Sequence, residues 1–276
     1  MNAKQRSEYW VKFERMRRQL DAKYSSLFKK AISKDLEKVA SDVRLYGTGA
    51  AQTLMGAYAW NDEMMKIMMQ LYREAAVMFG NASFRAVRNM SQKAANPFGL
   101  NDDFITTIMQ FLAQYGFMLV ADITQTTKKQ LLAIINKGVA EGLGIDEISR
   151  QIVQSDELGY AMMRARRIAR TEVMRASNYA AMEGAKLHNF EVDKVWIASR
   201  DIRTRRIPRN SYDHFNMDGA TVPFNEPFTS TGKKGDTVLA AQPGDPTAPA
   251  GFTINCRCTV GFVPKRDENG RLIMKR

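Results

Sequence analysis

The chain has two cysteines, Cys256 and Cys258, which lie one residue apart in the segment NCRCTV. Thiolates and imidazole nitrogens are zinc ligands. On a strand, residues i and i+2 point to the same face, so the two sulfurs could converge. We expect His214 to join them from a long loop, and Asp201 or His188 could complete a tetrahedral site. The pattern therefore predicts a structural zinc site near the C-terminus.

Other interpretations of the cysteine pair stay open at the level of sequence. C-x-C is a poorer zinc signature than C-x-x-C, and the chain has only 2 histidines. Two small, buried thiols without a metal would serve equally well as core residues. A disulfide between the two is disfavoured, because an extended i, i+2 pair lies at the upper edge of the allowed Cα separation.

The helical segment RARRIARTEVMRASNYAAMEGAK places Glu172 among small apolar residues that recur every three or four positions. A carboxylate there is costly unless it is paired, and Arg175 stands three residues further on. Because no nucleophile, partner base or phosphate loop accompanies Glu172, we expect a polar clasp between this helix and the following module. The sequence does not indicate an enzyme.

The pattern of elements changes near residue 190. Before it, helix-forming residues dominate and Pro97 is the only proline; from 191 onward there are seven prolines among short β-branched runs. We predict that residues 1–185 are almost wholly helical and that 191–263 form short strands and loops. The expected fold class is α+β, with an elongated, mostly helical N-terminal part followed by a small, loop-rich, β-containing C-terminal module.

The chain is basic, with 41 Lys+Arg against 29 Asp+Glu and a formal net charge of +12. Arginines gather in two segments, 161–176 and 200–209. Such clusters suit a polyanion, or they are solvated helix faces with structural ion pairs. No base-reading fold accompanies them. The candidates for contact with DNA are Arg164, Arg166, Arg167, Arg206 and Arg209.

Targeting signals are not evident in the sequence. The N-terminus lacks the apolar core of a signal peptide, and no apolar run reaches the roughly 18 residues that span a bilayer. We therefore expect a chain that meets a reducing cytosol and no membrane.

Five motifs follow one another in a recognisable order: ARTEV with a later Asn, KVWIASRDIRTR, a His followed by DGATVPFNEPF, PGDP and INCRCTV. Over about residues 121–263 this order resembles the phage Mu F-like head morphogenesis family. The matching residues are Ala169, Arg170, Thr171, Glu172, Asn178, Trp196, Asp201, Arg203, Arg205, His214, Asp218, Gly219, Pro227, Phe228, Pro243, Gly244, Asp245, Pro246, Asn255, Cys256, Arg257 and Cys258.

The resemblance implies a minor capsid protein of a tailed bacteriophage, present in multiple copies inside the head. Its implied partners are the portal, other head proteins and packaged double-stranded DNA, with host cytoplasm as the place of assembly. The alternative is a DNA-binding ejection protein that leaves the virion with the genome. A zinc-dependent enzyme or toxin-like effector fits less well, because only a short tail follows residue 263.

The sequence departs from the family pattern in one place. In similar sequences the histidine follows the RTR element after about two residues, whereas here RIPRNSYD separates Arg205 from His214. Either a loop is inserted or the role of the histidine is weakened. We predict three regions: 1–120, a helical docking or oligomerisation region that carries no motif of the family; 121–190, the helical part of the Mu F-like domain; and 191–276, a small β/loop module with a basic tail.

Overall fold

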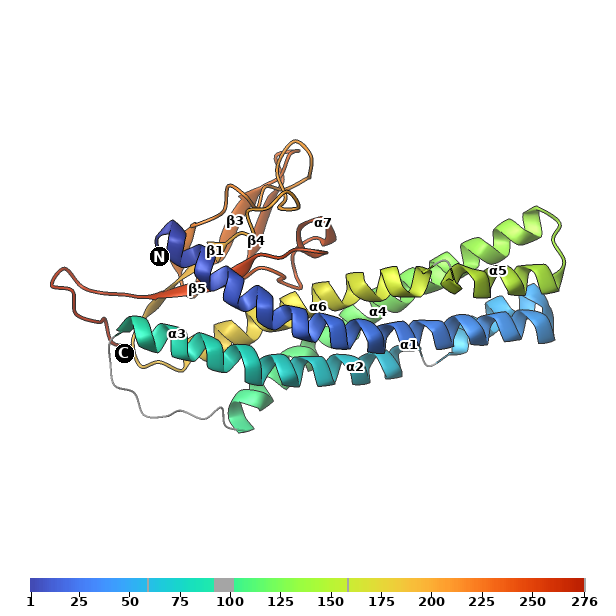
Figure 1. The fold of residues 1–276 in the computed structure, drawn as a ribbon, viewed down its shortest axis with the longest axis horizontal. Helices are drawn as coiled ribbons and strands as arrows, with labels where there is room; N and C mark the ends of the chain where they lie inside the picture. Colours follow the sequence, from blue (N-terminus) through green and yellow to red (C-terminus); the bar gives the residue numbers. More distant parts are fainter. Residues whose placement is uncertain (59, 92–101, 158, 276) are drawn as a thin grey trace. The chain divides into compact units, whose positions relative to one another are not determined.

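The structure is a computed structural model that describes residues 1–58, 60–91, 102–157 and 159–275. Helices occupy almost all of the described chain up to Lys186 (Figure 1). One non-helical residue, Gly47 (φ 80°), kinks the first of them. The helices are α1 (Ala3–Ala57), α2 (Trp60–Ala75), the π-helical turn η1 (Ala76–Gly80), α3 (Asn81–Ser91), α4 (Asp102–Ala140), α5 (Ile145–Glu157) and α6 (Tyr160–Lys186).

The predicted change near residue 190 is confirmed, and the fold is α+β. Among the described residues, no strand precedes Val192. The later elements are β1 (Val192–Ile197), β2 (Thr221–Pro223), β3 (Phe228–Thr231), β4 (Thr237–Ala240), α7 (Ala250–Thr253) and β5 (Thr259–Pro264).

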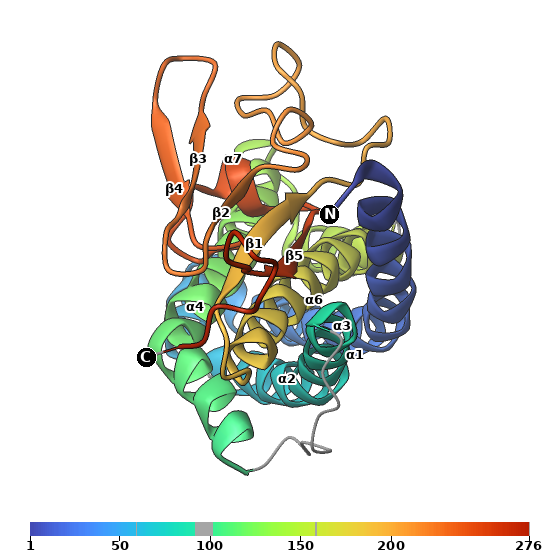
Figure 2. The same ribbon diagram turned by 90° about the vertical axis from the view of Figure 1, so that its left-hand side faces the viewer.

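Two small sheets form the C-terminal module (Figure 2). The first has the order β2-β1-β5, with antiparallel pairing throughout; Trp196 of β1 lies opposite Val260 of β5. The second is the β3–β4 hairpin, in which Thr231 pairs with Thr237. β1 is buried along nearly its whole length, and β2 and β5 pair with its two edges. This buried strand carries the central tryptophan of the module.

The chain divides into two compact units that are not contiguous in sequence. Unit 1 comprises Met1–Leu20, Leu71–Phe111 and Arg170–Arg276; unit 2 comprises Asp21–Gln70 and Leu112–Ala169. Four helices, α1, α2, α4 and α6, contribute residues to both units. The C-terminal module therefore belongs to one unit with the first turns of α1.

Unit 1 is built on close helix contact and on aromatic packing. A Cβ placed on Gly184 of α6 would lie 2.4 Å from the carbonyl oxygen of Gly80. The two backbones touch at this point, and only a glycine in α6 permits it. Phe111 stacks on Tyr179 with ring centroids 3.8 Å apart, and Phe13 packs beside Phe79 at 5.4 Å.

In unit 2, α1 presents a continuous apolar stripe to its neighbours. Its buried residues recur at four- and three-residue spacing, as expected for one helix face. α5 contributes Ile148 and Ile152, which are both buried. Ser149 donates a hydrogen bond to the Ala40 carbonyl at 2.9 Å. The stripe of α1 includes Tyr24, Phe28, Ile32, Leu36, Val39 and Val43.

α4 contains a segment, Asp103–Ala140, that is long and apolar enough to cross a membrane by length and composition, with a mean hydropathy of 1.5 in its most apolar window. The search for uninterrupted apolar runs in the sequence did not find this segment, because scattered polar residues end each run. Core helices of soluble proteins pass the same test, so these two properties alone do not assign α4 to a membrane.

Candidate functional site

Cys256 and Cys258 lie in the short segment between α7 and β5, not on the strand itself. Asn255 adopts a left-handed conformation (φ 58°), and the Cys256 N–H donates to the Thr253 carbonyl at 3.1 Å. The Cys258 N–H points back to the Cys256 sulfur at 3.4 Å instead of to a neighbouring strand. The predicted strand geometry is therefore wrong, and a tight turn brings the two sulfurs together.

His214 reaches the cysteines because the long loop before it closes on itself. The N–H groups of His214 and Phe215 both donate to the Arg205 carbonyl at 3.1 Å. Residues 206–213 therefore form a loop that begins after Arg205 and ends beside the same residue. His214 is 1% exposed and packs edge-on against Trp196 and Phe252. His214 therefore lies beside the cysteines although RIPRNSYD separates it from Arg205.

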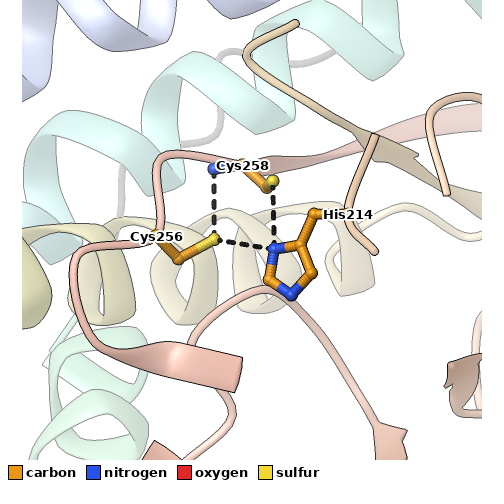
Figure 3. A group of neighbouring side chains, drawn as sticks. All are labelled: His214, Cys256 and Cys258. Carbon is orange, nitrogen blue, oxygen red and sulfur yellow. Dashed lines mark hydrogen bonds between the residues drawn. The ribbon is translucent and has the colours of Figure 1, made fainter. Parts of the chain in front are cut away.

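The three side chains form a compact donor set (Figure 3). His214 Nδ1 lies 3.4 Å from the Cys256 sulfur and 3.6 Å from the Cys258 sulfur. In a tetrahedral zinc site with Zn–S of about 2.3 Å and Zn–N of about 2.0–2.1 Å, a sulfur and a nitrogen stand about 3.5 Å apart. The donor atoms therefore have the spacing that a zinc ion requires, and the cluster could hold a metal.

Burial and mutual hydrogen bonding shift the pKa values of the two thiols in opposite directions. The hydrogen bond from Cys258 holds the pKa of Cys256 well below its usual value, with the nearby His214 acting in the same direction. Burial raises the pKa of Cys258 well above its usual value. His214 Nε2 is buried without a hydrogen-bond partner in the described structure. A cation bound between the two sulfurs would favour the loss of their protons.

Asp201 and His188, the two candidates for a fourth ligand, are not part of this donor set. The Asp201 carboxylate pairs with Arg257 and accepts the Arg203 N–H at 2.9 Å, so its charge is already neutralised. His188 stacks on Phe84 and bonds the carbonyl of the same residue at 3.1 Å. Among the described residues the donor set therefore consists of His214, Cys256 and Cys258, and both candidates for a fourth ligand are held by other partners.

Comparison with protein families now decides the assignment. Residues 129–261, about half of the chain, match the family described as "Phage Mu protein F like protein". Residues 129–261 belong to the phage Mu protein F-like family. The searches of curated proteins and of solved structures found no match. The family indicates a protein of phage head morphogenesis that is associated with the virion.

Asn178 links several segments of the Mu F-like region through hydrogen bonds. Its side-chain oxygen accepts hydrogen bonds from the Arg17 guanidinium, the Thr259 hydroxyl and the Val260 N–H, at 3.0, 3.0 and 3.1 Å. Its nitrogen donates to the Pro243 carbonyl at 2.9 Å. One amide therefore fastens α6 to α1, to β5 and to the QPGDP turn. This is the clasp that the sequence predicted, although its centre, Asn178, lies six residues beyond Glu172, which is nearly two helical turns.

Glu172 has the predicted partner. Its carboxylate pairs with Arg175, and the Tyr72 hydroxyl donates to it at 3.4 Å. Arg175 continues to the Gly244 carbonyl at 2.9 Å, which links the helix to the QPGDP turn. Thr171 accepts the Asn255 N–H at 3.1 Å and so anchors the turn before the cysteines. Arg170, the remaining motif residue here, is half-buried on α6.

The remaining motif residues shape the module around Trp196. Asp218 caps the end of β1 by accepting the Ala198 N–H at 3.0 Å. Gly219 follows in a left-handed conformation (φ 88°), within a turn in which the Ala220 N–H donates to the Met217 carbonyl at 2.9 Å. Arg205 donates to the carbonyls of Gly251 and Ile254, so it joins the loop to α7.

The candidate DNA-contact residues divide into two groups. On α6, Arg164 is turned inward: it donates to the Ile123 carbonyl at 2.6 Å, and burial lowers its pKa. Arg166 and Arg167 are exposed. Arg206 and Arg209 are also exposed, on the loop that closes at His214. Arg164 is therefore engaged in helix packing, and the other four side chains face solvent.

Sequence reasoning missed Arg17, which is 3% exposed in unit 1. Its guanidinium donates to the Ser177 hydroxyl at 2.7 Å, the Cys258 carbonyl at 3.2 Å and the Thr259 hydroxyl at 3.1 Å. Trp10 adds a bond to the Arg257 carbonyl at 2.8 Å. The local sequence indicated the burial of Arg17 only through its position between Phe13 and Leu20 on the apolar face of α1. This position was easy to overlook because residues 1–30 contain many other basic residues.

Proposed function

We propose that the protein is a structural minor head protein that sits inside the phage head, associates with the portal and contacts packaged double-stranded DNA. Family membership of residues 129–261 supports the head protein, and the +12 net charge supports the contact with DNA. The role is structural and not catalytic. Multiple copies per virion, assembled in the host cytoplasm, follow from the same proposal.

The observation that carries a structural role is how the family motif is used. The polar side-chain atoms form hydrogen bonds with other segments of the chain in Asn178, Thr171 and Asp218. Glu172 is neutralised by Arg175. A catalytic group has to reach a substrate, whereas these side chains hold an α6–turn–strand assembly together. The motif therefore specifies the assembly of the module.

The alternative proposal is an ejection protein that leaves with the genome. The exposed arginines favour it equally, because phosphate contacts would let the protein travel with DNA. The two proposals differ in where the protein resides after infection.

Quantitative mass spectrometry of purified virions, before and after DNA release, tests both. We expect the protein in intact heads and at unchanged copy number in emptied ones, with crosslinks to the portal. Loss from emptied heads would favour ejection. Absence of the protein from intact virions would overturn both versions.

We also propose that His214, Cys256 and Cys258 hold a structural zinc ion. The support is the match of the 3.4 and 3.6 Å nitrogen–sulfur distances to a tetrahedral edge, together with the burial of all three residues. The ion would join the His214 loop to the turn before β5. A small module with two short sheets gains stability from such a link.

Elemental analysis of the purified protein tests the metal. We expect about one zinc per chain in the wild type and far less in Cys256→Ser and in His214→Gln. His188→Gln is the matched control, because it removes the chain's other histidine and should retain the metal. A wild-type protein without metal after purification and zinc dialysis would refute the proposal.

A further inference from the structure

Two loops of the C-terminal module lie together and carry exposed basic side chains. The first is the 206–213 loop that closes at His214. The second is the 232–236 turn between β3 and β4. The Lys233 N–H donates to the Ser211 carbonyl at 2.7 Å, and the Lys233 ammonium reaches the Pro208 carbonyl at 3.4 Å. These bonds join segments that are more than twenty residues apart in sequence.

The joined loops are held by their own hydrogen bonds. Asn210 and Arg206 bond each other twice, through Asn210 N–H to the Arg206 carbonyl at 2.9 Å and Arg206 N–H to the Asn210 side chain at 3.1 Å. Tyr212 donates to Asp236 of the β3–β4 turn at 2.7 Å and packs on Phe252. The loops therefore present a formed surface without help from a ligand.

Four exposed basic residues project from this surface, and we call them the basic loop pair: Arg206, Arg209, Lys233 and Lys234. In the described part of the chain none of the four has a carboxylate partner. Arg206 stacks 3.4 Å from the Phe215 ring centroid, and Arg209 donates to the Thr204 carbonyl at 2.7 Å. Their charges thus remain available for an external anion.

The surrounding charge is also positive. The segments 200–213 and 232–236 together contain seven Lys/Arg and three Asp. Asp201 is already paired with Arg257, while Asp213 and Asp236 accept hydrogen bonds from Asn216 and Tyr212.

Figures 1 and 2 draw the β3–β4 turn at the end of the module away from the C-terminal half of α6.

We propose that the basic loop pair is the surface through which this protein binds the phosphate backbone of double-stranded DNA. This inference rests on the proposed contact with packaged DNA and assigns that contact to Arg206, Arg209, Lys233 and Lys234. Guanidinium and ammonium groups on loops suit phosphates. The binding is expected to be independent of base sequence, because contacts to phosphates position a protein on the duplex and carry no sequence information directly.

The test measures affinity for a duplex of random sequence at several salt concentrations. The full-length variant R206Q/R209Q/K233Q/K234Q should bind about tenfold or more weakly, and the dependence of log affinity on log salt should become shallower by up to about 3–4. The double variant K233Q/K234Q, which leaves the 206–213 loop unchanged, should show about half of that change in slope.

The matched control is K12Q/R15Q/K29Q/K30Q, which removes the same charge from exposed positions of α1. We expect it to bind almost as the wild type does. Circular dichroism and tryptophan fluorescence check that every variant is folded. Equal binding by the loop variant and the wild type overturns this assignment but leaves the proposed contact with DNA standing. If the wild type binds no duplex at all, the DNA contact itself is wrong, and the assignment falls with it.

A third outcome separates DNA from an acidic protein surface. If the loop variant binds duplex normally but is no longer incorporated into heads, the basic loop pair docks on protein, and the assignment to DNA is overturned.

Discussion

Glu172 and Arg175 form a buried ion pair within α6, with side chains 5% and 6% exposed. Removing one partner of such a pair leaves an uncompensated charge away from water. We expect Glu172→Gln to lower the free energy of unfolding by about 3–5 kcal/mol, measured by urea denaturation.

The same helix supplies the control for this prediction. Glu183 pairs with Lys186 at the same three-residue spacing, but the lysine side chain is 50% exposed. Glu183→Gln should therefore cost about 1 kcal/mol or less. Equal losses for the two variants would show that the buried pair contributes no more than the exposed one.

Lys194 is a second buried charge, 1% exposed on β1, where it donates to the Ala241 carbonyl at 2.8 Å. Burial lowers its pKa to about 8. In the unfolded chain a lysine has a pKa of about 10.4, so between these two values the unfolded chain binds more protons than the folded one. Stability due to this group therefore rises with pH across that window.

Lys194→Met removes this titration while keeping most of the side-chain volume. We expect the wild type to gain about 3 kcal/mol relative to the variant as the pH rises from about 7.5 to about 10.5. Urea denaturation of both proteins at the two pH values measures this difference. A stability difference that does not change with pH would contradict the lowered pKa.

At the scale of elements, the contact between α6 and η1 decides how closely the helices of unit 1 can pack. A methyl group on Gly184 would meet the Gly80 carbonyl at 2.4 Å, which is backbone and has no room to move aside. We expect Gly184→Ala to destabilise the protein by about 1–3 kcal/mol in thermal or urea unfolding.

Gly56 provides the opposite case. It lies in α1, and a methyl group added there would have no other atom within 4 Å among the described residues. Gly56→Ala should stabilise the protein by about 0.5–1 kcal/mol, since alanine loses less conformational entropy in a helix. The two identical substitutions should therefore have opposite signs, and like signs would argue against the close contact at Gly184.

At the scale of the whole molecule, the N-terminal turns of α1 complete the C-terminal module. Arg17 bonds residues that lie 160 to 242 positions further along the chain. We expect Arg17→Ala to cost about 3 kcal/mol or more, because several buried carbonyls and hydroxyls lose their donor. Urea unfolding followed by tryptophan fluorescence measures the loss.

The neighbouring arginine is the control. Arg18 has a side chain that is 72% exposed and stands 3.7 Å from Glu14. Arg18→Ala should change stability by about 0.5 kcal/mol or less. If both variants behave alike, the buried bonds of Arg17 do not hold the ends of unit 1 together. Arg17→Ala also tests whether the C-terminal module remains folded without its bonds to α1.

Local sequence determined much of this protein. Helix-forming composition and the distribution of prolines predicted helices over residues 1–185 and strands and loops over 191–263, because these preferences act over a few residues. In the structure α6 ends at Lys186 and β1 begins at Val192. The spacing of Glu172 and Arg175 predicted their pair, since residues i and i+3 share a helix face. The ordered motifs predicted the family, and the set of Cys256, Cys258 and His214 was correctly assembled.

Only the tertiary structure decided which distant groups meet. Asp201 binds Arg257 and not a metal site, and the cysteines converge through a turn and not a strand. Arg17 and Asn178 find each other across 161 positions, and Lys233 reaches the loop at Ser211. The contacts between distant residues depend on closing a long loop and on competition among several suitable partners. Neither is encoded in the preferences of neighbouring residues.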